Sequence, residues 1–247
     1  MRITVDLNCD VGEQLGPEAE ILPRVSSANI ACGAHAGDER TMRHAARAAV
    51  RLGLAIGAHV GLDDREHFGR RELDISPADA YQLLRRQVLA LRRIVHEEGG
   101  TLHHVKPHGA LYNMAARYAV LTDALVAATK ALGAELVFYG LSGSEMIRVA
   151  RGAGLAAASE VYADRAYQGD GSLRPRNLPG ALIVEPERAA DQVMHMLREG
   201  SVRAFDGTRV PVVAETICVH ADTPAAPAIL LAIRRRLAEA AVDVRPA

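Results

Sequence analysis

The sequence predicts an α/β protein whose parallel strands close into a TIM-like (β/α)7 barrel, with a single domain spanning residues 1–247. Seven short β-rich runs alternate with longer helical stretches, an order typical of parallel sheets with right-handed crossovers. Seven such units in 247 residues favour a barrel over an open sheet. A dinucleotide-binding open sheet is disfavoured because no GxGxxG motif follows the first run.

The expected strands are short and almost continuously apolar, as in parallel sheets that are covered on both faces. We expect them at Ile3–Asn8, Ala28–Cys32, Leu54–His59, Leu102–Lys106, Leu136–Tyr139, Leu155–Glu160 and Thr216–Val219.

The clearest expected helices carry recognisable start and stop signals. One covers Arg40–Leu52 and ends at Gly53, because glycine readily adopts the left-handed conformation that terminates a helix. Another begins after Ser76 with proline at its first position, and its apolar residues repeat every three or four positions until Gly99. Further helices are expected at about 118–132, 143–152, 187–198 and 225–240. The long polar segment Tyr162–Pro179 is expected to be either a functional lid or disordered.

Composition excludes several classes of protein. With 29 basic and 30 acidic residues the net charge is −1, which removes the electrostatic case for nucleic-acid binding. We expect no membrane span, since no window approaches 18 consecutive apolar residues, and no secretory signal at the charged N-terminus. Three cysteines without CxxC spacing argue against disulfides or a zinc ribbon, so we expect a cytoplasmic, reduced setting.

Polar residues gather at the carboxyl ends of the expected strands, where the loops of a parallel barrel build its site. Asp6, Asn8 and Asp10 alternate with period two, so an extended strand points all three to one face. His104, Lys106 and His108 alternate in the same way, so they also point to one face. Six of the ten histidines lie at strand ends: His35, His59, His103, His104, His108 and His220.

Other residues have simpler interpretations that stay open beside the functional ones. Asp6 is as readily a loop cap or the partner of a buried arginine, and His103 should face the helices. Cys9, Cys32 and Cys218 are expected to be packing residues, although Cys218 shares the parity of His220. Arg70 and Arg71 are equally suited to binding an anion or to fixing a loop.

Three kinds of chemistry fit this set of residues, and spacing does not choose among them. An Asp/Asn pair with His35 and His59 suits metal-assisted hydrolysis, although no HExxH helix motif is present. Lys106, with Mg²⁺ on Asp10 or Asn8, suits chemistry on a polyphosphate, although no GxxxxGK[ST] motif exists. Asp10 with His59 or His108 suits metal-free acid–base catalysis.

Seven strings, in order along nearly the whole chain, resemble the LamB/YcsF family, the A subunit of bacterial ATP-dependent 5-oxoprolinase. They are DLNCDVGE (6–13), ANIACGAHAGD (28–38), IGAHVG (56–61), FGRR (68–71), HVKPHGALYN (104–113), SEVYADRAYQGDGSLRPR (159–176) and ICVHAD (217–222). This chain departs from the usual family pattern at Ala34, Val60 and Ala221, which removes no polar group.

The resemblance implies a seven-stranded barrel related to polysaccharide deacetylases. It also implies cleavage of 5-oxoproline to glutamate, coupled to hydrolysis of ATP to ADP and phosphate, together with partner subunits B and C. ATP is then a required cosubstrate, and Mg²⁺ or another divalent cation is expected with it.

On this basis we assign hypothetical roles to the residues at the strand ends. Those expected to be catalytic are Asp10, His59, Lys106, His108 and Glu160. Those expected to bind substrate are Asn8, Asn29, His35, Arg70, Asp164, Arg165 and His220. A metal ion, if present, is expected on Asp10, His35 and His59.

Within this scheme Lys106 would offset charge on the transferring phosphoryl group, and Arg165, or Arg70 with Arg71, would hold the substrate carboxylate. We therefore expect Lys106→Met to abolish 5-oxoproline-dependent ATP turnover and leave the fold intact. Two other functions remain open: a metal-dependent amide hydrolase or deacetylase that needs no ATP, and a binding subunit whose partner does the chemistry. A homo-oligomer is also open.

Overall fold

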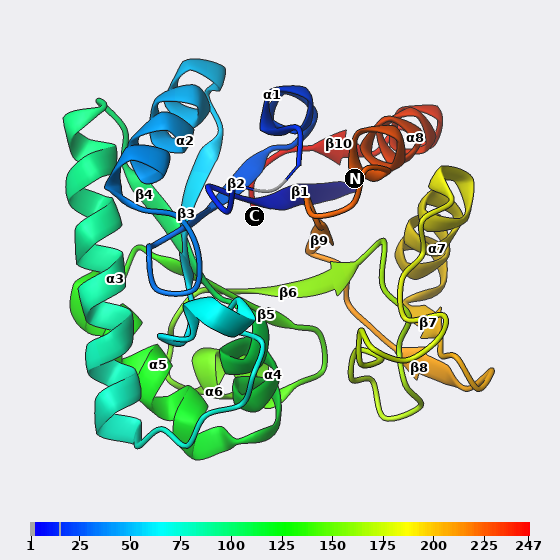
Figure 1. The fold of residues 1–247 in the computed structure, drawn as a ribbon. Helices are drawn as coiled ribbons and strands as arrows, with labels where there is room; N and C mark the ends of the chain where they lie inside the picture. Colours follow the sequence, from blue (N-terminus) through cyan, green and yellow to red (C-terminus); the bar gives the residue numbers. More distant parts are fainter. Residues whose placement is uncertain (1–2, 15) are drawn as a thin grey trace.

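Seven parallel strands close into a barrel in the computed structural model, which describes residues 3–14 and 16–247 (Figure 1). The strands are β1 (Thr4–Val11), β2 (Ser27–Ala31), β3 (Ala55–Val60), β4 (Leu102–Pro107), β5 (Val137–Leu141), β6 (Ala157–Tyr162) and β9 (Thr216–Val219). The barrel closes because β9 pairs with β6 on one side and with β1 on the other. The predicted (β/α)7 barrel is confirmed, and each expected strand overlaps an observed one.

Helices cover the outside of the barrel (Figure 1). They are α1 (Glu18–Ile21), α2 (Glu39–Leu52), α3 (Pro77–Glu97), α4 (Gly109–Arg117), α5 (Ala119–Leu132), α6 (Glu145–Gly152), α7 (Pro186–Glu199) and α8 (Ala226–Glu239), with short 3₁₀ turns η1 (Leu22–Arg24) and η2 (Arg65–His67). The predicted signals at α2 and α3 are present, since Gly53 ends α2 with φ of 66° and the Ser76 hydroxyl caps α3. Helix α4 is an addition that the apolar periodicity did not reveal.

Three strands lie outside the predicted set. Strands β7 (Ser201–Arg203) and β8 (Arg209–Pro211) form an antiparallel hairpin. Strand β10 (Asp243–Val244) pairs in parallel with the amino-terminal end of β1. The hairpin connection bonds to the long segment after β6, because the Phe205 amide donates to the Tyr167 carbonyl. Within that segment Tyr167 and Leu173 form an antiparallel bridge. The segment expected to be a lid or disordered is therefore an ordered loop beside the site.

The apolar core lies between the strands and the helices, whereas the barrel interior is polar. Asp6 occupies this interior and accepts hydrogen bonds from four hydroxyl groups, which replaces the expected loop cap or arginine partner. Those hydroxyls belong to Ser26, Ser27, Tyr139 and Thr216. His104 stacks on Tyr139 with ring centroids 4.0 Å apart. These side chains fill the barrel interior toward the amino ends of the strands, so the open space is confined to the carboxyl ends.

Within the described residues, no helix is both long enough and apolar enough to cross a membrane.

Candidate active site at the barrel mouth

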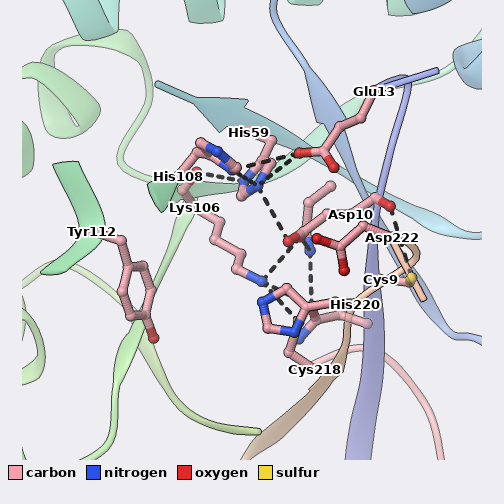
Figure 2. Close-up of polar contacts among 12 residues, drawn as sticks. Cys9, Asp10, Glu13, His59, Lys106, His108, Tyr112, Cys218, His220 and Asp222 are labelled. Atoms are coloured by element: carbon pink, nitrogen blue, oxygen red, sulfur yellow. Dashed lines mark hydrogen bonds and ion pairs between the residues drawn. The ribbon is translucent and has the colours of Figure 1, made fainter. Parts of the chain in front are cut away.

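A cavity of about 1030 Å³ opens at the carboxyl ends of the barrel strands, which we call the barrel mouth. Asp10 and Glu13 reach it from the end of β1, His59 from β3, Lys106 and His108 from the end of β4, and His220 from the end of β9 (Figure 2). Its outer rim is lined by Arg70, Arg165, Arg176 and Asp222. The period-two alternation predicted this convergence because residues of one parity on each strand point inward.

Lys106 is the charged centre of the site. Its Nζ lies 3.0 Å from Asp10 Oδ1 and 2.9 Å from Glu160 Oε1, and the side chain is 1% exposed. Burial by itself lowers the pKa of Lys106, but the nearby carboxylate of Asp10, together with that of Glu160, holds it well above its usual range. Lys106 is therefore a permanent ammonium group at the floor of the cavity.

The Cys218 thiol is part of this centre. Its Sγ lies 3.1 Å from Lys106 Nζ, and burial raises the pKa of the thiol well above its usual range. Cys218 is buried in the apolar core as expected of a packing residue, as Cys9 and Cys32 are, and its contact with Lys106 is an addition to that role. Its parity with His220 was the sequence signal for this contact.

Glu160 has no room for a direct substrate contact. Its Oε1 accepts from Asn8 Nδ2 at 3.0 Å as well as from Lys106, and its Oε2 accepts from two tyrosine hydroxyls. Those are Tyr112 at 2.8 Å and Tyr162 at 3.0 Å. A fully hydrogen-bonded, buried carboxylate fixes the ammonium in place.

Asn8 and Asn29 lie beneath the cavity and do not line it. The Asn29 amide donates to Asn8 Oδ1 and to Asp10 Oδ1, both at 2.8 Å, and accepts from His104 Nε2 at 2.6 Å. With these groups engaged, the two asparagines orient Asp10 and Glu160 rather than meet a ligand, which differs from the binding role expected of them.

Four residues form a second group beside Lys106, which we call the imidazole cluster: Glu13, His35, His59 and His108. Their donor atoms all lie within 4.8 Å of one another, and all four residues are buried. Burial lowers the pKa of His35 and of His108, so these rings are neutral at pH 7. Asp10 joins the two groups, because its Oδ2 lies 3.3 Å from His59 Nε2.

Asp164 and His220 form a pair on the opposite wall. The carboxylate accepts from the His220 backbone N–H and from its Nδ1, each at 3.0 Å, and the ring stacks on Tyr162. Burial would raise the pKa of Asp164, but its contacts with His220 hold it below its usual range. Asp164 thus orients His220, which lines the cavity, and does not line it itself.

The rim carries an arginine pair that the sequence revealed only in part. Asp222 Oδ2 accepts from Arg70 at 2.7 Å and from Arg176 at 2.8 Å, so one carboxylate holds two guanidinium groups beside the cavity. Arg165 is buried at the same wall, donates to the Arg174 carbonyl, and has a Nε atom without a hydrogen-bond partner among the described residues. Arg71 instead contacts Asp64 outside the cavity lining.

Several site residues were not predicted: Glu13, Tyr112, Tyr162, Cys218, Arg176 and Asp222. Tyr162 lies two positions after Glu160 on β6, so the same period-two rule would have pointed it inward had the expected strand extended further.

Comparison with known proteins places these residues in a family. The LamB/YcsF family model matches residues 5–247. The chain is 47% identical over 246 residues to the A subunit of 5-oxoprolinase from Brevibacillus brevis, covering 98% of this chain and 97% of the relative. The crystal structure of the lactam utilization protein from Thermus thermophilus has a TM-score of 0.91 at 43% identity, covering 98% of this chain and 99% of that one.

A more distant likeness concerns the fold alone. The peptidoglycan deacetylase PdaC from Bacillus subtilis gives a TM-score of 0.51 at 12% identity, covering 99% of this chain and 87% of that one. The matched family model spans the barrel and every residue of the mouth described above, and we conclude that this chain belongs to the LamB/YcsF family.

Proposed function

We propose that this chain is the lactam-cleaving A subunit of an ATP-dependent 5-oxoprolinase, which converts 5-oxoproline to glutamate with formation of ADP and phosphate. One observation carries the proposal: a buried ammonium group, Lys106, lies between two carboxylates at the floor of a cavity rimmed by arginines. The names of the relatives, which are the A subunit of 5-oxoprolinase and a lactam utilization protein, support the choice of substrate.

The chemistry explains why such a site needs a cation and ATP. An unstrained lactam is a poor electrophile, and its nitrogen is a poor leaving group. Transfer of the γ-phosphoryl group to the amide oxygen forms an O–P bond and releases ADP. Water then adds to the activated carbon, and the ring C–N bond breaks as a proton goes to nitrogen, which leaves the new carboxyl group as an acyl phosphate. A second water hydrolyses the acyl phosphate to glutamate and phosphate.

The residues at the floor suit the first half of this reaction. Lys106 stabilises negative charge on the transferring phosphoryl group, since a preorganised ammonium group is most effective where water is excluded. Asp10, which lines the cavity, would hold the cation that accompanies the nucleotide, which we take to be Mg²⁺. Glu160, with Asn8 and Asn29, keeps Lys106 and Asp10 in place.

The walls suit the second half. His59 and His108 are placed to move protons to and from the water and the lactam nitrogen, because both rings line the cavity. Arg70 and Arg176, held by Asp222, bind the substrate carboxylate, with Arg165 beside them. His220, oriented by Asp164, contacts the substrate from the facing wall.

Partner subunits complete the assembly in this proposal. The curated relatives are each named as the A subunit of 5-oxoprolinase, which supports an assembly with other chains, and we take these to be subunits B and C. The test is an assay of glutamate, ADP and phosphate from 5-oxoproline, run with the chain alone and with B and C. Equal amounts of the three products, with ATP required, support the proposal. No glutamate under any combination contradicts it.

A second function is favoured by the imidazole cluster: metal-dependent hydrolysis of a lactam or amide without ATP. The same assay separates the two, since glutamate formation that is unchanged when ATP is omitted favours the metal-dependent hydrolase. A chain that binds 5-oxoproline, while every catalytic group lies in a partner, is the third alternative.

A further inference from the structure

We propose that His59, His108 and Glu13 form a binding site for one borderline transition-metal ion of the Zn²⁺ class, distinct from any Mg²⁺ that accompanies a nucleotide. The proposal concerns metal binding by the isolated chain, so it does not rest on the ATP-dependent reaction proposed above.

Hydrogen bonds to the backbone fix which nitrogen of each ring carries a proton. His59 Nδ1 lies 3.2 Å from the Lys106 carbonyl oxygen, and His108 Nε2 lies 2.9 Å from the Phe68 carbonyl oxygen. A carbonyl oxygen only accepts, so each ring donates its N–H there. With those N–H groups directed at the backbone, His59 Nε2 and His108 Nδ1 are the nitrogens left free to bind a cation.

Those two nitrogens face each other, 2.9 Å apart. Two nitrogens this close need a shared cation between or beside them, which is either a proton or a metal ion. The ring planes are 89° apart, which lets the two lone pairs converge on one point from different directions (Figure 2). Backbone acceptors that fix the tautomer of metal-ligating histidines are a recurrent feature of such sites.

Glu13 supplies the third donor at a fitting distance. Its Oε1 lies 3.7 Å from His59 Nε2 and 3.5 Å from His108 Nδ1. In a tetrahedral site with bonds of about 2.05 Å, two donors lie about 3.4 Å apart. The three separations, 2.9, 3.5 and 3.7 Å, lie on both sides of that value, and the two that involve Glu13 are too long for ordinary hydrogen bonds.

His35, which was expected to be a ligand, lies in the outer shell. Its ring stacks on His108 with centroids 3.8 Å apart and an interplanar angle of 5°. Because an imidazole binds a metal in its own ring plane, one ion does not lie in both of two parallel stacked planes. His35 Nε2 is instead 3.3 Å from Glu13 Oε1, where its N–H orients the ligating carboxylate.

The backbone around the cluster leaves room for the rings and for nothing larger. A Cβ atom at Gly61 would overlap the His35 ring at Nδ1, and one at Gly69 would lie 2.7 Å from His35 Cβ. Gly69 also has φ of +62°, a conformation that favours glycine. These contacts give the IGAHVG and FGRR strings a physical role, which is to pack the imidazoles closely.

Two competing placements of a cation fit less well. Asp10, Cys218 and His220 also lie within reach of one ion, but the Lys106 ammonium already contacts Asp10 and Cys218 at 3.0 and 3.1 Å. Mg²⁺ prefers oxygen ligands, whereas two of the three donors proposed here are imidazole nitrogens. Asp10 Oδ2 lies 3.3 Å from His59 Nε2, beside the proposed site. An ion here would occupy the nitrogens through which His59 and His108 would move protons, so the loaded chain would use the ion as a Lewis acid and the metal-free chain would use the imidazoles as proton carriers.

The test is a titration of the chelator-stripped chain with Zn²⁺ by calorimetry and with Co²⁺ by visible absorption, neither of which needs catalysis. We expect one ion per chain, and affinity reduced by about 100-fold or more in His108→Gln and in Glu13→Gln. His35→Asn should weaken binding by about 10–100-fold, as loss of an outer-shell partner does. His220→Asn is the matched control, since it removes a mouth histidine from the competing cluster only, and it should keep wild-type affinity.

Circular dichroism of each metal-free variant separates loss of the site from loss of the fold. The proposal is overturned if the folded wild-type chain binds neither Zn²⁺ nor Co²⁺. It is also overturned if His220→Asn loses the ion and His108→Gln retains it, because the ion then sits in the other cluster. If the chain binds the metal ion but the assembled subunits do not turn over 5-oxoproline, the metal site is supported and the proposed function is contradicted.

Discussion

Replacing Lys106 by methionine should stop the reaction and also destabilise the protein. The side chain is 1% exposed and contacts two carboxylates, Asp10 and Glu160, which are 7% and 0% exposed. Methionine fills a similar volume but leaves both carboxylates without their cation. The sequence alone predicts an unaffected fold for this variant, and the burial of the ion pairs changes that expectation.

The expected loss of stability follows from the cost of leaving a buried charge without its partner, about 3–5 kcal/mol. For a chain of this size each kcal/mol lowers Tm by about 2–4 °C, so Tm should fall by about 6–20 °C. Adding Glu160→Gln removes one of the stranded charges. The double variant should therefore recover about 0.5–3 kcal/mol, the usual coupling between contacting residues.

Urea unfolding monitored by circular dichroism measures these differences. Lys130 is the matched control because it is the only other lysine of the chain and lies exposed on α5. Lys130→Met should change the free energy of unfolding by less than about 0.5 kcal/mol. If Lys106→Met is as stable as Lys130→Met, or if Glu160→Gln adds further destabilisation to it, the ion pairs do not hold the floor of the site as described.

Three further predictions follow from the same contacts. Gly57→Ala should cost about 1–3 kcal/mol in urea unfolding, because its Cβ would overlap the His104 ring at Nε2; an unchanged midpoint would contradict this packing. Asp164 has a pKa that its contacts with His220 hold below the ordinary 3.8, against the effect of burial. Its contribution to stability is present above that value and is lost as the pH falls through the folded pKa, so the stability gap between wild type and Asp164→Asn should narrow below about pH 4; a gap that widens in acid would contradict the sign. Arg176→Ala should raise KM for 5-oxoproline by about 10-fold or more with a smaller change in kcat, since a charge-assisted hydrogen bond contributes about 1.5–3 kcal/mol. Arg71 lies outside the cavity lining, so Arg71→Ala should leave KM unchanged. If Arg176→Ala and Arg71→Ala change KM equally, Arg176 does not bind the substrate carboxylate.

The period-two alternation explains why much of the site could be predicted from the sequence. Asp10 and Lys106 project inward because every second residue of a barrel strand does, and the closed barrel brings them within 3.0 Å. The barrel could be predicted from the number of β/α units, since each unit repeats a short apolar strand followed by an amphipathic helix.

The unpredicted parts depend on loops, whose geometry periodicity does not describe. Glu13 follows Gly12, a residue with φ of +74°, so the direction of its side chain is set by a turn rather than by strand parity. Arg176 and Arg70 come from loops more than 100 positions apart and are joined only through Asp222. Cys218 looked apolar by type, and only the position of Lys106 shows that its thiol belongs to the charged centre.

Turnover by a His59→Asn chain, assembled with wild-type B and C subunits, tests the central claim most directly. The claim is that the barrel mouth of this chain carries out the lactam chemistry, with His59 lining the cavity 3.3 Å from Asp10. We predict that glutamate formation falls by about 100-fold or more, the usual contribution of a positioned acid–base group. Glutamate formation at the wild-type rate in that assembly would place the chemistry in another subunit.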